Sequence, residues 1–190
     1  MSSISENVIK DHLSKRLELL AQLNLNEIKL VFDIIHSAYD NSRTIFLVGN
    51  GGSSSTAQHF AVDLGTGSLK YSRAVKVLAL SENSAIITAT ANDFGVENIF
   101  AQQIKLLGQS GDVLFLFTAS GNSANLLYAN EVAMNMGMTT VSFTGFDGGI
   151  IKNKTSHNLH IATDVGDYGL VEDVHLILCH ILTDCQRESP

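Results

Sequence analysis

Proline is almost absent from this chain, since Pro190 is the only one among 190 residues. No helix or strand is therefore interrupted internally by the residue that most strongly breaks regular structure. Clusters of basic residues are also missing, and the formal net charge is −7. Binding to duplex nucleic acid requires several Lys or Arg side chains directed at phosphates, so the sequence argues against a nucleic-acid partner.

Cysteine is nearly as scarce, with only Cys179 and Cys185 in the chain. Both fall in one helical pattern, so a disulfide framework is not expected and we predict two free, buried thiols in a reducing cytoplasm. No apolar run approaches the length of a membrane span, and the first residues lack the basic and apolar regions of a signal peptide. The expected protein is cytoplasmic and has no membrane partner.

Apolar residues are plentiful, at 45% of the chain against 16% for charged residues. A chain of this length and composition fits a single domain with a sizeable core. We expect this domain to span residues 1–190, with N-terminal helices in residues 1–40 and an α/β core in residues 41–190. The surplus of apolar residues also indicates surface that is buried in an oligomer.

Hydrophobic patterns predict five strands, each largely aliphatic on both faces, at Thr44–Val48, Ala74–Leu80, Val113–Phe117, Thr139–Thr144 and Leu159–Ala162. Helical periodicity lies between and after them, at Ser53–Leu64, Asn83–Ala91, Glu97–Leu107, Asn122–Met136 and Gly169–Gln186. Apolar strands that alternate with helices predict an α/β fold with a doubly wound parallel sheet covered by helices.

Two further helices are predicted before the first strand. Ser3 and Glu6 can form a capping box, and Asn24 and Glu27 repeat this start signal before a second apolar periodicity. These helices could form an appendage that packs on a neighbouring subunit.

Two glycine- and serine-rich loops directly follow apolar strands, at Gly49–Ser53 and Thr118–Ser123. Each loop then opens a helix, whose unpaired N–H groups and positive dipole end favour an anion. In doubly wound sheets, ligands bind at these carboxyl ends of strands. Neither loop contains a lysine, so a single phosphate monoester is favoured over a nucleoside triphosphate.

A simpler interpretation of the first loop is a tight turn that needs glycine only for its backbone conformation. Two loops with several hydroxyls at equivalent strand ends favour phosphate binding instead. A dinucleotide cofactor is not expected, because the third glycine of the Rossmann pattern is absent and no acidic residue closes the second strand.

His59 and Asp63 lie four residues apart, on one face of the helix that the first loop opens. Because Phe60 and other apolar residues follow His59, a packed core histidine is an equally good interpretation. The pair Asn92–Asp93 also has two interpretations. It is either an ordinary helix terminator, which the sequence alone favours, or an amide and a carboxylate that bind sugar hydroxyls.

The last helix carries Glu172, Asp173, His175 and His180 in an otherwise apolar stretch. Polar groups in a buried helix need partners. Glu172 and His180 are separated by about 12 Å along the helix axis. They can meet one ligand only if their side chains lean toward each other, or if they serve different subunits. His175 lies on another face and is predicted to be structural or part of an interface.

Six segments of the chain together form a recognisable set: Gly49–Ser53, Ala57–Ala61, Ala91–Gly95, Ser120–Asn125, Thr144–Gly149, and Glu172–His175 with His180. In this order they resemble the sugar isomerase (SIS) domain family, and within it the phosphoheptose isomerases. The resemblance covers essentially the whole chain, whereas the serine loop alone would indicate only a SIS domain.

The resemblance implies a three-layer αβα sandwich with a five-stranded parallel sheet, and a homotetramer with sites at subunit interfaces. It implies isomerisation of sedoheptulose 7-phosphate to D-glycero-D-manno-heptose 7-phosphate, the first step toward heptoses of lipopolysaccharide or capsule. It also implies zinc in the site, and no nucleotide cofactor is expected.

The resemblance also assigns roles to residues by their position. The substrate-binding residues would be Asn50, Gly51, Gly52, Ser53, Asn92, Asp93, Thr118, Ala119, Ser120, Ser123 and Glu172. The metal ligands would be His59, Asp63, Glu172 and His180. We expect Asp63 and His180 to be the acid–base pair of an isomerisation through an enediol, with zinc polarising the carbonyl.

Some positions depart from the family pattern. Asp63 stands where glutamate is usual, Glu172 where glutamine is usual, and Thr118–Ala119 where Ser-Thr is usual. The longer Glu172 could compensate for the shorter Asp63, and its charge should strengthen a divalent cation site. Two alternatives therefore stay open, namely a non-catalytic SIS module that binds a sugar phosphate or a protein, and an isomerase of another ketose phosphate.

Overall fold

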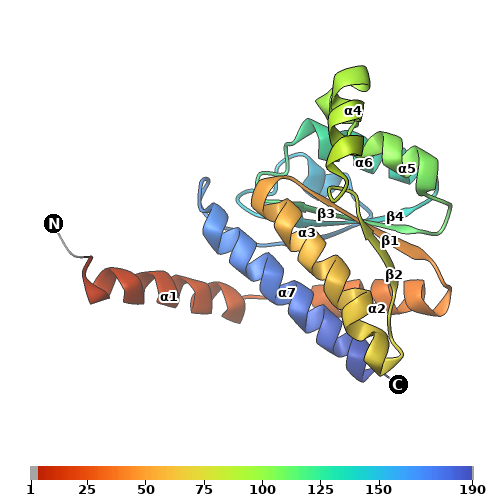
Figure 1. Cartoon of the computed structure of the whole chain (residues 1–190). Coiled ribbons are helices and arrows are strands. Elements are labelled where there is room, and N and C mark those ends of the chain that lie inside the picture. The colour runs from red at the N-terminus through yellow and green to blue at the C-terminus, as the bar shows by residue number, and fades with distance from the viewer. Residues whose placement is uncertain (1–3, 190) are drawn as a thin grey trace.

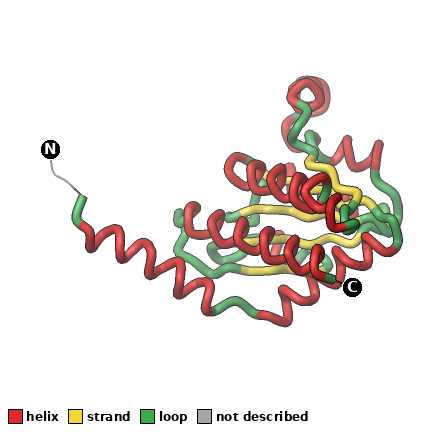
Figure 2. The backbone as a smooth tube through the Cα atoms, turned by 60° about the horizontal axis from the view of Figure 1, so that its bottom comes forward, coloured by secondary structure: helices red, strands yellow, loops and turns green. Residues whose placement is uncertain are grey.

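The computed structural model describes residues 4–189 and contains a parallel sheet between two layers of helices (Figure 1; Figure 2). Its five strands are β1 (Thr44–Gly49), β2 (Lys76–Ala79), β3 (Val113–Thr118), β4 (Thr139–Thr144) and β5 (His157–His160). They are ordered β2-β1-β3-β4-β5 and all pair in parallel. This is the order of a doubly wound sheet, so the predicted α/β fold is confirmed.

The helices of the described residues are α1 (Glu6–Ala21), α2 (Leu25–Asp40), α3 (Gly51–Leu64), α4 (Ser84–Phe94), α5 (Ala101–Leu107), α6 (Ala124–Asn135) and α7 (Tyr168–Glu188). Short 3₁₀ helices add η1 (Thr66–Tyr71), η2 (Val96–Asn98) and η3 (Ile151–Asn153). No helix within residues 4–189 has the length and apolar character needed to cross a membrane.

Helices α2, α3 and α7 cover one face of the sheet, and α5 and α6 cover the other. Phe60 of α3 and Leu178 of α7 belong to the first core, and Ile104 of α5 and Leu126 of α6 to the second. Strand β3 is buried along its whole length because its alternate side chains enter both cores. Each large apolar side chain that is fully buried in this way stabilises the fold by about 1.5–3 kcal/mol.

Helix α1 stands away from this body and buries none of its residues (Figure 2). Its Leu13 and Leu17 are 57% and 67% exposed. Arg16 ties it to α7, because the Nε of Arg16 donates a 2.6 Å hydrogen bond to Oδ2 of Asp173. Helix α2, in contrast, buries Ile35 and other residues against the sheet. Of the two N-terminal helices expected as an appendage, only α1 is one.

The predicted helix starts can be compared directly with these two helices. Asn24 caps α2 as expected, since its Oδ1 accepts a 3.0 Å hydrogen bond from the backbone N–H of Asn26. Ser3 of the predicted capping box lies outside the described residues. Helix α1 instead has Ser5 at its N-cap, without a side-chain capping bond.

Several element bounds differ from the sequence prediction; β2 begins at Lys76 instead of Ala74, and α4 extends to Phe94 instead of Ala91. The last strand, expected at residues 159–162, lies at His157–His160 because it aligns with β4. The Nδ2 of Asn158 donates a 2.7 Å bond to the Oγ of Ser142, so this polar edge strand is held by side chains as well as by its ladder. The helix expected at residues 97–107 is divided into η2 and α5. Apolar periodicity continues through the turn between them, where Ile99 and Phe100 are buried.

The prediction of two buried thiols holds only in part. Cys179 is buried and free, and burial raises the pKa of its thiol. Cys185, on the same helix, is also free but exposed, because its position on α7 faces away from the sheet.

His175 is a second buried ionisable group of α7, and its burial within one chain agrees with the structural role among the two roles predicted for it. Its ring lies against Phe117 and Phe143 at centroid distances of 6.1 and 5.9 Å. Among the described residues, neither ring nitrogen finds a hydrogen-bond partner. Burial lowers the pKa of His175 from 6.5 to about 4, so the folded protein holds this imidazole neutral.

We predict an acid-dependent loss of stability that originates at His175. The unfolded chain takes up a proton near pH 6.5 while the folded chain resists it, so the stabilisation is present above pH 6.5 and is lost toward pH 4. Between pH 6.5 and 5 the loss amounts to about 2 kcal/mol. Urea unfolding of the wild type and of His175→Leu at both pH values measures it. Equal losses in the two proteins would contradict this origin.

Candidate active site

The two glycine/serine loops lie side by side at one edge of the sheet, because β1 and β3 are neighbouring parallel strands. A cavity of about 150 Å³ opens between them. Its lining is Asn50, Ser53, Phe117, Thr118, Ala119, Ser120, Ser123, Leu126, Tyr168 and Glu172. The cavity is smaller than the ~300 Å³ or more of a typical complete small-molecule site. It has room for a compact group such as phosphate, but the rest of a sugar must extend beyond it.

The helices that start at this cavity leave their first N–H groups without side-chain caps. Asn50 is the N-cap of α3 and Ser123 that of α6, and neither side chain makes a capping bond. Helix α4, in contrast, is capped by Asn83, which accepts two backbone hydrogen bonds. The uncapped starts of α3 and α6 therefore offer N–H groups and two positive dipole ends to an anion.

Side-chain contacts hold the two loops in place around the cavity. Asn50 and Asn125 form a reciprocal amide pair, with N···O distances of 3.0 and 2.8 Å, that links the start of α3 to α6. The Oγ1 of Thr118 accepts a 3.0 Å hydrogen bond from the backbone N–H of Gly121. The second loop also packs directly on the loop after β4, because an added Cβ on Gly121 would lie 2.0 Å from the carbonyl oxygen of Gly148.

A second group of polar side chains lies further along α3 and α7. The Nε2 atoms of His59 and His180 are 2.9 Å apart. Oδ2 of Asp63 lies 3.2 Å from the first nitrogen and 3.7 Å from the second. The i,i+4 spacing on α3 brings His59 and Asp63 together, and the packing of α7 adds His180 from 117 residues beyond Asp63 in the sequence, 180 minus 63.

The donor atoms of His59, Asp63 and His180 fit a metal ion. All three lie within 4.8 Å of one another. A tetrahedral zinc with bonds of ~2.0–2.1 Å keeps neighbouring ligand atoms about 3.3 Å apart, and the observed distances of 2.9, 3.2 and 3.7 Å lie around this value. Two imidazoles and one carboxylate are also ligand types of catalytic zinc sites, which keep a fourth position open.

The group lies at the surface of the chain, since the side chains of His59 and His180 are 49% and 48% exposed. The interpretation of His59 as a packed core histidine was therefore wrong. Phe60, its neighbour on α3, points into the core instead. Asp63 is less accessible, with 21% of its side chain exposed.

Helices α3 and α7 run parallel and contact each other at successive levels (Figure 1). Gly52 faces the carboxylate of Glu172 at the first level, and His59 faces His180 at the second. An added Cβ at Gly52 would occupy the place of the Glu172 carboxylate, so this glycine lets the carboxylate lie directly against α3. Glu172 therefore lies at the phosphate-sized cavity and is not part of the His59–Asp63–His180 group.

Asn92 and Asp93 are not brought to either group within one chain. They lie near the end of α4, which projects from the body (Figure 1; Figure 2). Both are exposed, and the Nδ2 of Asn92 donates a 2.8 Å bond to Oδ1 of Asp93. Apolar residues beside them are exposed as well, with Phe94 at 60% and Val96 at 63%.

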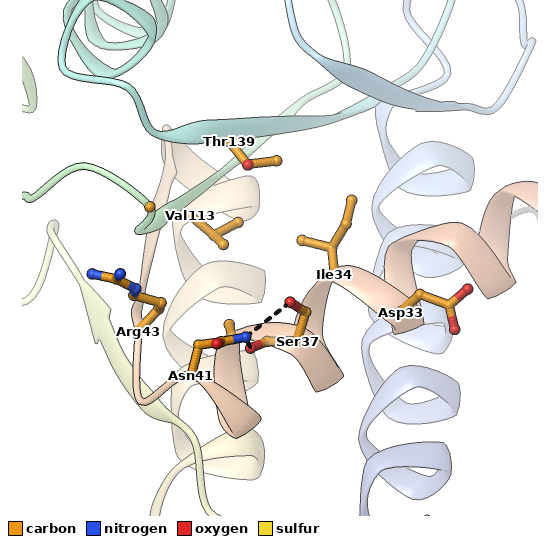
Figure 3. Close-up of a pocket in the computed structure, with 9 residues that line it drawn as sticks. Asp33, Ile34, Ser37, Asn41, Arg43, Val113 and Thr139 are labelled. Atoms are coloured by element: carbon orange, nitrogen blue, oxygen red, sulfur yellow. Dashed lines mark hydrogen bonds between the residues drawn. The ribbon is translucent and has the colours of Figure 1, made fainter.

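A separate cavity of about 290 Å³ lies at the opposite edge of the sheet (Figure 3). It is lined by residues of α2 and by the amino ends of strands, among them Arg43, Val113 and Thr139. Two of its polar side chains bind each other, since the Nδ2 of Asn41 donates a 3.3 Å hydrogen bond to the Oγ of Ser37 and also donates to the Ser37 backbone carbonyl at 2.8 Å. None of the predicted site residues lines it, and ligands of doubly wound sheets bind at the other edge.

Sequence reasoning missed two residues of the site region. Tyr168, the first residue of α7, lines the cavity between the loops. Arg187, in the last turn of α7, approaches Asp63. No motif or spacing marks Arg187, because 124 residues separate it from Asp63, 187 minus 63.

Comparisons with known proteins agree in family and fold. A family model described as "SIS domain" matches residues 10–145. A phosphoheptose isomerase of Helicobacter pylori strain P12 is 39% identical over 177 residues, which cover 93% of this chain and 88% of that protein. One from Clostridium acetobutylicum is 33% identical over 84% of this chain and 81% of its own length. The solved structure of phosphoheptose isomerase GmhA from Neisseria gonorrhoeae matches with a TM-score of 0.87 and 26% identity, covering 95% of this chain and 97% of that chain.

Proposed function

Because the chain belongs to the SIS domain family, and within it to the phosphoheptose isomerases, we propose that it interconverts sedoheptulose 7-phosphate and D-glycero-D-manno-heptose 7-phosphate. The enzyme is a sugar-phosphate isomerase, and its product would supply heptoses for lipopolysaccharide or capsule. One observation carries the proposal. Asp63 and His180 converge to 3.7 Å, and a phosphate-sized cavity lies at the uncapped start of α3, the helix that carries Asp63.

The phosphate of the substrate is proposed to bind between the loops. The hydroxyls of Ser53, Ser120 and Ser123 and the N–H groups that start α3 and α6 would hold it. Glu172 carries a negative charge at the α3 side of this cavity, next to Gly52. Repulsion between carboxylate and phosphate would direct the phosphate toward the start of α6, and leave Glu172 to accept hydrogen bonds from sugar hydroxyls.

The carbonyl end of the sugar is proposed to reach the group on α3 and α7. His59 lies about 9 Å along the helix axis from Ser53, a span that an extended seven-carbon chain can bridge. Asp63 would accept the proton from the carbon beside the carbonyl and return it to the neighbouring carbon. Without a metal, one of the two Nε2 atoms in the 2.9 Å contact would carry its hydrogen, and His180 would exchange that proton with the sugar oxygens. When both Nε2 atoms hold a metal they carry no proton, and His180 would then act on the sugar oxygens as a ligand of that metal.

Zinc is proposed as the cation that His59, Asp63 and His180 hold. When bound there, it would polarise the sugar carbonyl and stabilise negative charge on the enediol oxygens. Glu172, expected from the sequence to be a fourth ligand, is assigned to the substrate instead, because its carboxylate faces Gly52.

Removal of the metal is the direct test of the zinc assignment. Treatment with a chelator is expected to lower kcat at least about 100-fold, because the Lewis acid contributes several kcal/mol to the barrier. Stoichiometric zinc should restore it, whereas Mg²⁺ should not, since imidazole ligands favour zinc. Undiminished turnover after complete chelation would refute the zinc assignment and leave the acid–base assignment standing.

The substrate is tested with the purified chain and a panel of ketose phosphates. Sedoheptulose 7-phosphate should be converted with the highest kcat/KM, and a product trap should report the aldose. Conversion of a hexulose or pentulose phosphate in preference would shift the assignment to another sugar. Saturable binding without turnover, with zinc present, would identify a non-catalytic sugar-phosphate-binding protein.

A homotetramer is proposed as the working assembly. Three features of the single chain support it: α1 buries no residue, the His59–Asp63–His180 group is half open to solvent, and α4 carries Asn92 and Asp93 away from both groups. In an oligomer, a neighbouring copy would cover the apolar side of α1 and bring its α4 over the site. Light scattering should then give about 82 kDa, four times the chain mass of 20.5 kDa.

A further inference from the structure

Arg187 is the Lys or Arg side chain that contacts Asp63 in the described part of the chain. Its Nη2 lies 4.0 Å from Oδ1 of Asp63 and donates a 3.3 Å hydrogen bond to the backbone carbonyl of the same residue. Oδ2 of Asp63 faces His59 and His180. The two oxygens of this carboxylate therefore have different partners, with the guanidinium on one side and the imidazoles on the other.

The guanidinium is itself held on several sides. Its Nε donates a 3.2 Å hydrogen bond to the Oγ of Ser68. The hydroxyl of Ser68 in turn donates a 2.6 Å hydrogen bond to the backbone carbonyl of Asp63. Its Nη1 lies 3.4 Å from Oδ1 of Asp184, and its plane packs 5.4 Å from the Tyr71 ring centroid. Each nitrogen of the fork thus has a partner, and Arg187 has little freedom to move.

Asp63 needs such a partner for an electrostatic reason. It is the penultimate residue of α3, where the helix dipole is negative and a carboxylate is disfavoured. Without a cation nearby, the Asp63 carboxylate would be more stable if it turned away from the helix end and toward water. Arg187 offsets the dipole, and its planar fork fixes a direction that a flexible ammonium group does not fix.

We infer that Arg187 is a positioning residue of the site, which holds Oδ2 of Asp63 toward the two histidines through contacts on the opposite side of the same carboxylate and its backbone carbonyl. This inference rests on the proposed function, in which Asp63 is a metal ligand and base. Arg187 touches neither substrate nor metal in this scheme, and it acts only through Asp63.

Charge and positioning make opposite predictions for zinc affinity. A cation near the site repels zinc, so if only its charge mattered, Arg187→Gln would bind zinc more tightly and Arg187→Lys would equal the wild type. If the fork positions Asp63, both variants should bind zinc more weakly. Loss of a partner that orients a metal ligand typically costs 10- to 100-fold in affinity. We expect about 10-fold for Arg187→Lys, in which the charge is conserved.

The experiment is a competition titration of zinc against a chromophoric chelator, combined with thermal unfolding of each variant in excess EDTA. Arg73→Lys is the matched control, because this guanidinium packs 5.3 Å from the Tyr39 ring centroid and makes none of the contacts with Asp63. Its zinc affinity should stay within about twofold of the wild type.

Two results would overturn the inference. One is a zinc affinity of Arg187→Lys within twofold of the wild type, and the other is tighter zinc binding by Arg187→Gln. If the variants lower only the metal-free Tm and leave the zinc affinity unchanged, Arg187 has a structural role and does not position Asp63. If the wild type itself binds no zinc, the metal assignment has failed separately, and kcat decides. In that case a tenfold lower kcat of Arg187→Lys at unchanged KM supports positioning, and an unchanged kcat rejects it.

Discussion

Replacing Asp63 by asparagine is expected to lower kcat by about 10²- to 10⁴-fold, the range that a positioned general base contributes. The amide has the same shape as the carboxylate, so the packing of α3 against α7 should persist. What it loses is the anionic oxygen that lies 3.2 and 3.7 Å from the two imidazoles. Steady-state kinetics with sedoheptulose 7-phosphate measures the change, with circular dichroism as the check on folding.

A matched control for this substitution is Asp184→Asn. Asp184 is also a carboxylate within reach of Arg187, at 3.4 Å, but its side chain is 67% exposed and lies outside the three-residue group. Its removal should leave kcat within about twofold of the wild type, because exposed ion pairs contribute little. Retention of more than a tenth of the wild-type kcat by Asp63→Asn would rule out Asp63 as the base.

The double variant Asp63→Asn/His180→Gln adds a stricter criterion. Residues that act as one catalytic unit show strongly non-additive losses, since the second substitution removes what the first has already disabled. The double variant should therefore be nearly as active as the weaker single variant. Multiplication of the two single losses would mean that Asp63 and His180 act independently.

Substituting alanine for Gly121 is expected to reduce the free energy of unfolding by about 3 kcal/mol or more. Gly121 has φ +65°, in the left-handed region where a side chain is strained, and its Cβ would also lie 2.0 Å from the carbonyl oxygen of Gly148. The obstacle is backbone, so one of the two loops has to move. The corresponding fall in Tm is roughly 6–12 °C for a chain of this size.

Gly51→Ala separates the two causes of that loss. Gly51 has φ +53°, close to that of Gly121, but nothing lies within 4 Å of its added Cβ. This variant should lose only the conformational part, about 1–2 kcal/mol. Gly121→Ala should also weaken binding of inorganic phosphate, because Ser120 and Ser123 belong to the loop that is displaced. Equal losses in the two variants would show that the contact with the loop after β4 is unimportant.

Local sequence signals were sufficient for much of the fold and for the loops. Apolar runs followed by glycine and serine predicted both the strands β1 and β3 and the helix starts after them, since each signal depends on neighbouring residues. The pair His59 and Asp63 was equally visible, because four residues on a helix return to the same face. These are features that a chain specifies within one or two turns.

Contacts between distant segments were beyond local patterns. The pairing of His180 with His59 depends on which faces of α3 and α7 meet, and the resemblance to a family, not spacing, pointed to it. Arg187 gave no signal for the same reason. The edge strand β5 was displaced by two residues in the prediction because its partner β4, and not its own aliphatic run, decides its position.

Because α3 and α7 pack in parallel, one motion, a slide of one helix along the other, would change three separate contacts at once. These contacts join the same two helices: the carboxylate of Glu172 lies against Gly52, His180 pairs with His59, and Arg187 contacts Asp63. A slide of one helix by a single residue, about 1.5 Å, would disrupt all three contacts together. Mutations that weaken the packing at the C-terminal end of α7 should therefore also change the position of the loop at the start of α3.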